Sequence, residues 1–229
     1  ELKKTNSELD RFVYSASHDL RSPLTSLRGL IQILEMQIDA SEKVDKEPIH
    51  LMTKTINKMD QFISDILDYS LNTRTELAHE KINLETLIKS IWKDLEYMDL
   101  DYHPELNWDV KVTADFYSDP KRVAIILNNL ISNAFKYHDK SKVNHFVNIT
   151  ISTDDQKAII IIEDNGIGIS EEYIDKIFNM FHRATKLSTG SGMGLYIVKE
   201  TVEKLNGSII VASELKKGTK FTVEIPNTL

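Results

Sequence analysis

The chain has 229 residues and a mass of 26.3 kDa, enough for one large domain or two small ones. Apolar residues make up 41% and the formal net charge is −7, which favours a globular protein and argues against nucleic acid as the main partner. The absence of cysteine excludes disulfides and thiolate metal sites, and no apolar run approaches the roughly 18 residues that span a membrane. The chain starts inside a helical pattern, without Met or a signal-peptide pattern, so we expect a fragment of a longer protein.

The first third of the chain predicts two long helices. Residues 1–39 place apolar side chains at the alternating spacings of a heptad seam. The seam stutters around Leu20, and Pro23 lies in the helix interior, so a kink is expected there. After a charged turn at 40–47, a second seam runs from Pro48 to Thr75. Two such helices form an antiparallel hairpin, whose wide apolar face predicts that two copies pair into a four-helix bundle.

From Lys81 onward the pattern changes to mixed helices and strands. Of the eight glycines only Gly29 precedes residue 160, so loops that need close backbone approach lie in the last third. Helices are expected at Leu84–Met98, Pro120–Tyr137, Glu171–Phe178 and Leu195–Leu205. Strands are expected at Trp108–Thr113, Phe146–Thr153, Lys157–Glu163, Ser208–Ser213 and Lys220–Ile225. The second and third of these strands should form a hairpin, because only a short turn separates them.

One histidine of the first helix lies off the apolar seam. His18 is followed directly by Asp19, and Pro23 comes one turn later. A carboxylate next to an imidazole can orient it, fix one tautomer and accept a proton, which would make His18 a nucleophile. Taken alone, the residues favour the other interpretation, a solvent-facing histidine beside a proline kink.

Two glycine clusters mark the last third of the chain. Asp164 ends a strand that looks buried, and Gly166 and Gly168 follow it, so its carboxylate could accept a hydrogen bond from an exocyclic amine beside a cavity. The second cluster opens the helix at Leu195, where backbone N–H groups favour phosphate. Its glycines are Gly190, Gly192 and Gly194. The spacing is neither that of a P-loop nor that of a Rossmann turn, and an ordinary loop is the alternative for each cluster.

Four polar side chains share one face of the helix expected at 120–137. They are Asn129, Asn133, Lys136 and Tyr137. Amide oxygens together with one lysine suit ligation of Mg²⁺ and contact with polyphosphate. A solvated polar face is the alternative, although paired asparagines are poor helix formers and weigh against it.

In combination, these motifs resemble the sequence boxes of bacterial sensor histidine kinases. The H-box is resembled by His18-Asp19-Leu20-Arg21-Ser22-Pro23-Leu24, the N-box by Asn129–Tyr137, the G1-box by Asp164–Gly168, the F-box by Phe178–Phe181, the G2-box by Gly190–Gly194 and the last glycine box by Gly218–Phe221. The boxes follow the family's order and spacing and cover nearly the whole chain. Each motif alone is a weak signal, but six of them in the family's order make the resemblance strong.

The resemblance implies a multidomain fold. Residues 1–78 would be an all-α dimerisation and histidine phosphotransfer domain, in which two helical hairpins form a homodimeric four-helix bundle. Residues 79–229 would be a catalytic ATP-binding domain, an α/β two-layer sandwich of the kind found in gyrase and heat-shock chaperones. Residues 179–192 would form a mobile lid, with Arg183 as a candidate contact of the γ-phosphate.

The resemblance also implies the roles of single residues. His18 would be the phosphoacceptor and Asp19 its general base, while Ser22 stands where members with phosphatase activity usually carry Thr or Asn. Asn133 would bind Mg²⁺ with Asn129 beside it. The ATP-binding residues would be Asn129, Asn133, Lys136, Tyr137, Asp164, Gly166, Gly168, Arg183, Gly190, Gly192, Gly194, Leu195 and Thr219, with Asp164 taking the adenine amino group and Thr219 supporting it.

The expected function is therefore that of an ATP-dependent histidine kinase. It would autophosphorylate His18 and pass the phosphoryl group to an Asp of a response-regulator receiver domain. A catalytically quiet dimeric scaffold that binds ATP or a receiver is the alternative, and a stand-alone ATPase is disfavoured because Asn129 stands where hydrolysing relatives carry a Glu base. We expect a cytoplasmic segment without membrane or nucleic-acid contact, joined through its N-terminal coiled coil to an upstream sensor. The stimulus, the cognate regulator, the membrane anchoring of the full-length protein, and phosphorylation within or between subunits stay open.

Overall fold

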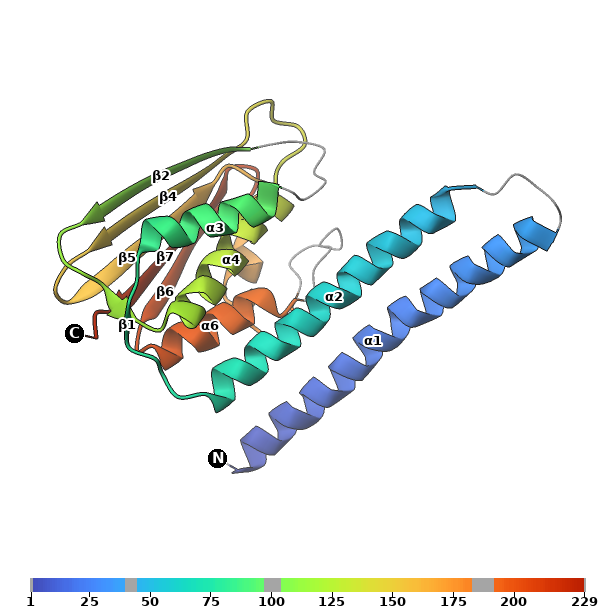
Figure 1. Ribbon diagram of the computed structural model, residues 1–229, viewed down its shortest axis with the longest axis horizontal. Helices are drawn as coiled ribbons and strands as arrows, with labels where there is room; N and C mark the ends of the chain where they lie inside the picture. Colours follow the sequence, from blue (N-terminus) through green and yellow to red (C-terminus); the bar gives the residue numbers. More distant parts are fainter. Residues whose placement is uncertain (1, 40–44, 97–103, 183–191, 229) are drawn as a thin grey trace. The chain divides into compact units, whose positions relative to one another are not determined.

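The structure is a computed structural model that describes residues 2–39, 45–96, 104–182 and 192–228 (Figure 1). Of residues 2–19 it describes the backbone alone. The chain divides into two compact units, residues 1–67 and residues 68–229. The last turns of the second helix therefore belong to the same unit as the sheet.

The first unit is a helical hairpin. It consists of α1 (Leu2–Asp39) and most of α2 (Glu47–Arg74), which run in opposite directions (Figure 1). Both helices were predicted to within one residue at each described end. The predicted turn at 40–47 lies largely outside the described residues. None of the described helices is both long and apolar enough to cross a membrane.

Large apolar side chains remain exposed on this hairpin. Their exposed fractions lie between 38% and 71%, and the residues are Leu24, Ile31, Ile33, Met36, Ile38, Ile49, Leu51, Ile56, Ile63 and Leu67. One hairpin cannot bury them by itself, as the two heptad seams predict.

The helix α1 continues through Pro23. After the proline, the hydroxyl of Thr25 donates to the carbonyl oxygen of Arg21 at 3.0 Å, and that of Ser26 donates to the carbonyl of Ser22 at 3.3 Å. Such back-bonding accompanies helix bending. The kink at Pro23 itself stays a prediction.

The second unit is a two-layer sandwich, as predicted. Its strands are β1 (Glu80–Lys81), β2 (Glu105–Val112), β3 (Tyr117–Ser118), β4 (Phe146–Thr153), β5 (Lys157–Asp164), β6 (Ser208–Glu214) and β7 (Gly218–Pro226). Its helices are α3 (Leu84–Glu96), α4 (Pro120–Lys136), α5 (Glu171–Ile174) and α6 (Gly194–Lys204). The main sheet has the order β2-β4-β5-β7-β6, with β2 and β4 parallel and the other neighbours antiparallel. The predicted hairpin is the β4–β5 pair.

The core of this unit lies between the sheet and the helices α3, α4 and α6, which cover one face of it (Figure 1). Every second residue of the central strands is buried, because side chains alternate between the two faces of a strand. The buried apolar residues of β4, β5 and β7 are Val147, Ile149, Ile151, Ala158, Ile160, Ile162, Phe221, Val223 and Ile225. The helix α4 starts where Pro120 follows Asp119, whose side chain accepts the N–H of Arg122 and so caps the helix.

Three details differ from the sequence prediction. The strand predicted at Trp108–Thr113 spans Glu105–Val112. The helix predicted at Glu171–Phe178 ends at Ile174, because the chain then passes into tight turns in which Lys176 donates to Tyr173 and Asn179 to Lys176. The short strands β1 and β3 were not predicted at all. A pair of two-residue strands has no periodicity to detect.

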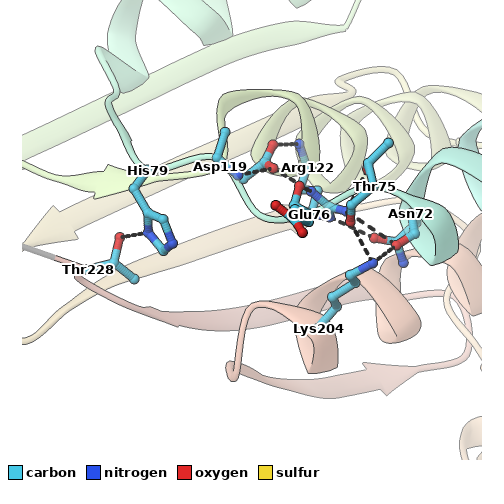
Figure 2. Close-up of polar contacts among 9 residues, drawn as sticks. Asn72, Thr75, Glu76, His79, Asp119, Arg122, Lys204 and Thr228 are labelled. Carbon is cyan, nitrogen blue, oxygen red and sulfur yellow. Dashed lines mark hydrogen bonds and ion pairs between the residues drawn. The ribbon is translucent and has the colours of Figure 1, made fainter.

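Within the second unit, the end of α2 is held by a buried arginine (Figure 2). The guanidinium of Arg122 donates from Nε to Asn72 Oδ1 at 3.0 Å and from Nη2 to the carbonyl of Thr75 at 2.9 Å. It also forms an ion pair with Asp119, whose other partner is the backbone N–H of Ala78 at 3.0 Å. Arg122, Asp119 and Asn72 are each only 3% exposed. The network therefore replaces water at the carbonyl end of the helix.

A second cation completes this junction. Lys204, the last residue of α6, donates to the carbonyl oxygens of Asn72 and Thr75, the same acceptors that Arg122 uses. Burial and the nearby Arg122 charge lower the pKa of Lys204. Tyr69 of α2 also packs against Tyr196 of α6, with ring centroids 5.9 Å apart. The last turn of α2 is thus held from both α4 and α6.

We expect Arg122→Met to lower the free energy of unfolding of the second unit by about 3–5 kcal/mol, since it leaves the buried Asp119 without its cation. The two tryptophans, Trp92 and Trp108, both lie in this unit, so urea unfolding followed by tryptophan fluorescence reports on it alone. Lys121→Met, an exposed neighbour, should change the value by less than about 0.5 kcal/mol. Equal midpoints for the two variants would contradict this role of Arg122.

Candidate functional site

A partly buried carboxyl group lies where β5 ends. Burial raises the pKa of Asp164 to about 6, and this rise is limited by hydrogen bonds from the backbone N–H groups of Gly166 and Thr219 and by the charge of Lys142. The Gly166 bond to Asp164 Oδ1 measures 2.7 Å. The carboxyl group is therefore mostly ionised at neutral pH, and it can accept a hydrogen bond from an amine.

The loop after Asp164 packs against the end of α4. The N–H of Ile167 donates to the carbonyl oxygen of Tyr137 at 2.9 Å. A Cβ atom on Gly166 would lie 2.3 Å from the same oxygen, so only glycine fits there without a backbone shift. Tyr137 and Gly166 lie 29 positions apart in the sequence, so this contact joins two motifs that are distant in the chain.

Thr219 lies beside Asp164, and its backbone N–H donates to the Asp164 carboxyl group. The two residues are partners in the β5–β7 ladder, and Thr219 is buried. Its hydroxyl lies 2.9 Å from that of Ser213, which donates to the carbonyl of Gly218 and accepts the N–H of Ile169, both at 2.8 Å. Sequence reasoning missed Ser213, because its role depends on a cross-strand neighbour and not on a local motif.

The asparagine face of α4 meets the start of α6. Asn129 Nδ2 donates to the carbonyl of Ile125 at 2.9 Å, and a Cβ atom on Gly194 would lie 2.6 Å from Asn129 Oδ1. Asn133 is half-buried one turn further along α4, followed by the exposed Lys136 and the half-buried Tyr137. The structure thus brings the predicted N-box together with the last glycine of the second cluster.

The start of α6 has the features of an anion site. The helix begins at Gly194 after Met193, whose side chain makes no capping hydrogen bond. Gly192 has a φ of +75°, and Leu195 is half-buried in the first turn. Uncapped N–H groups at a helix start favour phosphate. Gly190 and Arg183, and most of the predicted lid at 179–192, lie outside the described residues.

The remaining site residues belong to the other unit. His18 and Asp19 lie on α1, where the structure describes their backbone, and Ser22 is exposed one turn later. Positions 18, 22 and 25 share a face of the helix because they are four and three residues apart.

Two family models match the chain. Residues 8–74 match the His kinase A (phospho-acceptor) domain, and residues 118–229 match the histidine kinase-, DNA gyrase B- and HSP90-like ATPases. The chain belongs to the histidine kinases. Their two characteristic domains coincide with the helical hairpin and with the greater part of the sandwich.

Curated relatives of this kinase chain are much longer than it is. Cyanobacterial phytochrome B of Nostoc is 31% identical over 228 residues, which are 96% of this chain and 30% of the relative. Autoinducer 2 sensor kinase/phosphatase LuxQ of Vibrio vulnificus is 30% identical over 230 residues, which are 94% of this chain and 26% of the relative. The chain therefore spans less than a third of either relative.

Solved structures share the fold. The histidine kinase AdeS of Acinetobacter baumannii is 26% identical with a TM-score of 0.69, and the match covers 93% of this chain and 98% of that one. The histidine kinase ThkA, solved in complex with the response regulator protein TrrA, is 23% identical with a TM-score of 0.70 over 99% of this chain and 64% of that one.

We expect Gly166→Ala to weaken ATP binding at least about tenfold, because the new Cβ atom would push the loop away from Tyr137. Binding of a fluorescent ATP analogue measures the effect. Gly29→Ala is the matched control, since a Cβ atom at Gly29 meets nothing within 4 Å. Equal affinities of the two variants would show that the contact does not shape the site.

Proposed function

We propose that this chain is the core of an ATP-dependent protein-histidine kinase, which phosphorylates its own His18 and passes the phosphoryl group to an Asp of a response-regulator receiver domain. The observation that carries the proposal is that the helix α4 meets two other motifs in the second unit, Gly166 at Tyr137 and Gly194 at Asn129. The family models assign a phosphoacceptor domain to the first unit and an ATPase domain to the second.

ATP fits the residues that surround the site. The ionised Asp164 accepts the adenine amino group, and Thr219 keeps the carboxyl group in place through the β5–β7 ladder. Gly166 and Gly168 shape the base pocket, where side chains would collide with neighbouring backbone. The phosphates lie at the start of α6, and the residues proposed to contact them are Lys136, Tyr137, Arg183, Gly190, Gly192, Gly194 and Leu195.

Mg²⁺ fits the amide oxygens of α4. Among the described residues, no three His, Asp or Glu side chains gather into a metal site, so a cation would combine amide oxygens with phosphate oxygens. We propose Asn133 as its ligand, with Asn129 beside it. A bound cation would neutralise charge that develops on the phosphates during transfer.

The proposed transfer uses two neighbouring residues of α1. Nε2 of His18 attacks the γ-phosphorus of ATP, while the bond from that phosphorus to the bridging oxygen breaks and ADP leaves with the electron pair. Asp19 accepts the hydrogen bond of the other ring nitrogen and stabilises the imidazolium that forms. The product is a phosphohistidine.

We propose that the kinase acts as a homodimer through residues 1–78. The exposed apolar side chains of the hairpin, such as Ile31 and Ile56, are covered when two hairpins form a four-helix bundle. Light scattering should give the mass of two chains, and the mass of one chain would overturn the dimer.

Membership of the histidine kinases supports proposals for partners outside this chain. ThkA, which shares this fold, was solved with a response regulator, so we propose a receiver domain as the acceptor of the phosphoryl group. We propose an upstream sensor joined through α1, a cytoplasmic location, and Ser22 as the position that decides phosphatase activity. Transfer of label from the phosphorylated chain to candidate receiver domains tests the proposed acceptor. If a Ser22→Ala variant dephosphorylates the receiver as the wild type does, Ser22 does not decide phosphatase activity.

Incubation with Mg²⁺ and ATP labelled on the γ-phosphate tests the kinase directly. The wild type should acquire label that is acid-labile and base-stable, as a phosphohistidine is, and His18→Gln should acquire none. His50→Gln is the matched control, because His50 is an exposed histidine of α2 and should leave labelling unchanged.

Label that persists in His18→Gln would refute the assignment of the acceptor. ATP binding without any label on the wild type would instead favour the quiet scaffold.

A further inference from the structure

A lysine outside all six sequence boxes contacts the base-binding loop. Lys142 lies between α4 and β4, in a turn where its N–H donates to the carbonyl of Asp139 at 2.9 Å. Its ammonium group donates to the carbonyl oxygens of Asn165 at 2.6 Å, Lys217 at 3.2 Å and Gly166 at 3.4 Å. One cation thus joins the loop after β5 to the turn between β6 and β7.

The neighbouring asparagine strengthens the same connection. Asn165 Nδ2 donates to the carbonyl of Asn144 at 2.7 Å, and its Oδ1 accepts the N–H of Phe146 at 3.0 Å. The segment 142–146 and the loop 164–166 therefore each donate hydrogen bonds to the other. This leaves the loop little freedom to move away from α4.

The charge of Lys142 acts on Asp164 as well. The charged groups that act on this carboxyl are Lys142, which favours its ionised form, and Glu163, which opposes it. Glu163 is itself 3.9 Å from Lys220 on the neighbouring strand. The remaining stabilisation comes from the N–H groups of Gly166 and Thr219.

We propose that Lys142 is a positioning residue of the nucleotide site, whose ammonium group holds the loop carbonyls of Asn165 and Gly166 so that Asp164 faces the adenine amino group. The proposal rests on the proposed function, because it takes ATP as the ligand of this loop. Lys142 acts through Asp164 and the loop backbone and does not itself react.

The test is the affinity of the full chain for Mg²⁺-ATP as a function of pH. Lys142→Met should weaken binding roughly tenfold at neutral pH, the size expected for loss of a charge-assisted hydrogen bond. It should also move the loss of affinity on acidification to higher pH, because Asp164 then takes up its proton more readily. The ATP phosphates titrate in the same way with the wild type and with Lys142→Met, so their effect cancels in the ratio of the two affinities.

Two further variants make the result decisive. Lys140→Met removes the same charge from an exposed side chain two residues earlier and should bind like the wild type. Lys142→Gln keeps a donor but no charge, so it should shift the pH dependence even if Lys142→Met fails to fold. An unchanged pH dependence in the Lys142 variants, or an equal effect of Lys140→Met, would overturn the proposal. A wild type that binds no ATP would refute the proposed function instead.

Discussion

The loop after β5 lies so close to the end of α4 that residue 166 has no room for a Cβ atom. This approach connects two segments that the sequence keeps apart, and it fixes the backbone that surrounds Asp164. Burial raises the pKa of this carboxyl group to about 6, and its hydrogen bonds limit the rise, so that the group is mostly ionised at neutral pH. The rest of the site, from Thr219 on β7 to the start of α6, is arranged around these two elements.

A second constraint fixes the last turn of α2 within the second unit. The carbonyl end of α2 is bonded by Arg122, the first-turn arginine of α4, and by Lys204 at the end of α6. The last turn of α2, which belongs to the second unit, is thus bonded to both α4 and α6. Loss of water at this junction is compensated by a complete set of hydrogen bonds around Arg122.

Local sequence patterns predicted many of the helices and strands, but they did not predict contacts between residues far apart in the sequence. The heptad seams predicted α1 and α2 closely, and alternation predicted β4 and β5, because periodicity reports which face is buried. The early end of α5 and the pair β1–β3 were missed, since neither has a period long enough to read. Lys142, Ser213 and Arg122 were missed for another reason. Each acts on partners far away in sequence, and only the folded chain brings them together.

The claim at the centre of this account is that Asp164 recognises the base of the nucleotide. Calorimetric titration of the full chain with ATP and with GTP, both in Mg²⁺, tests it most directly. ATP should bind, because its exocyclic amine donates to the carboxylate, and GTP should bind far more weakly, because it presents a carbonyl oxygen at the same place. Equal affinity for the two nucleotides would contradict the account.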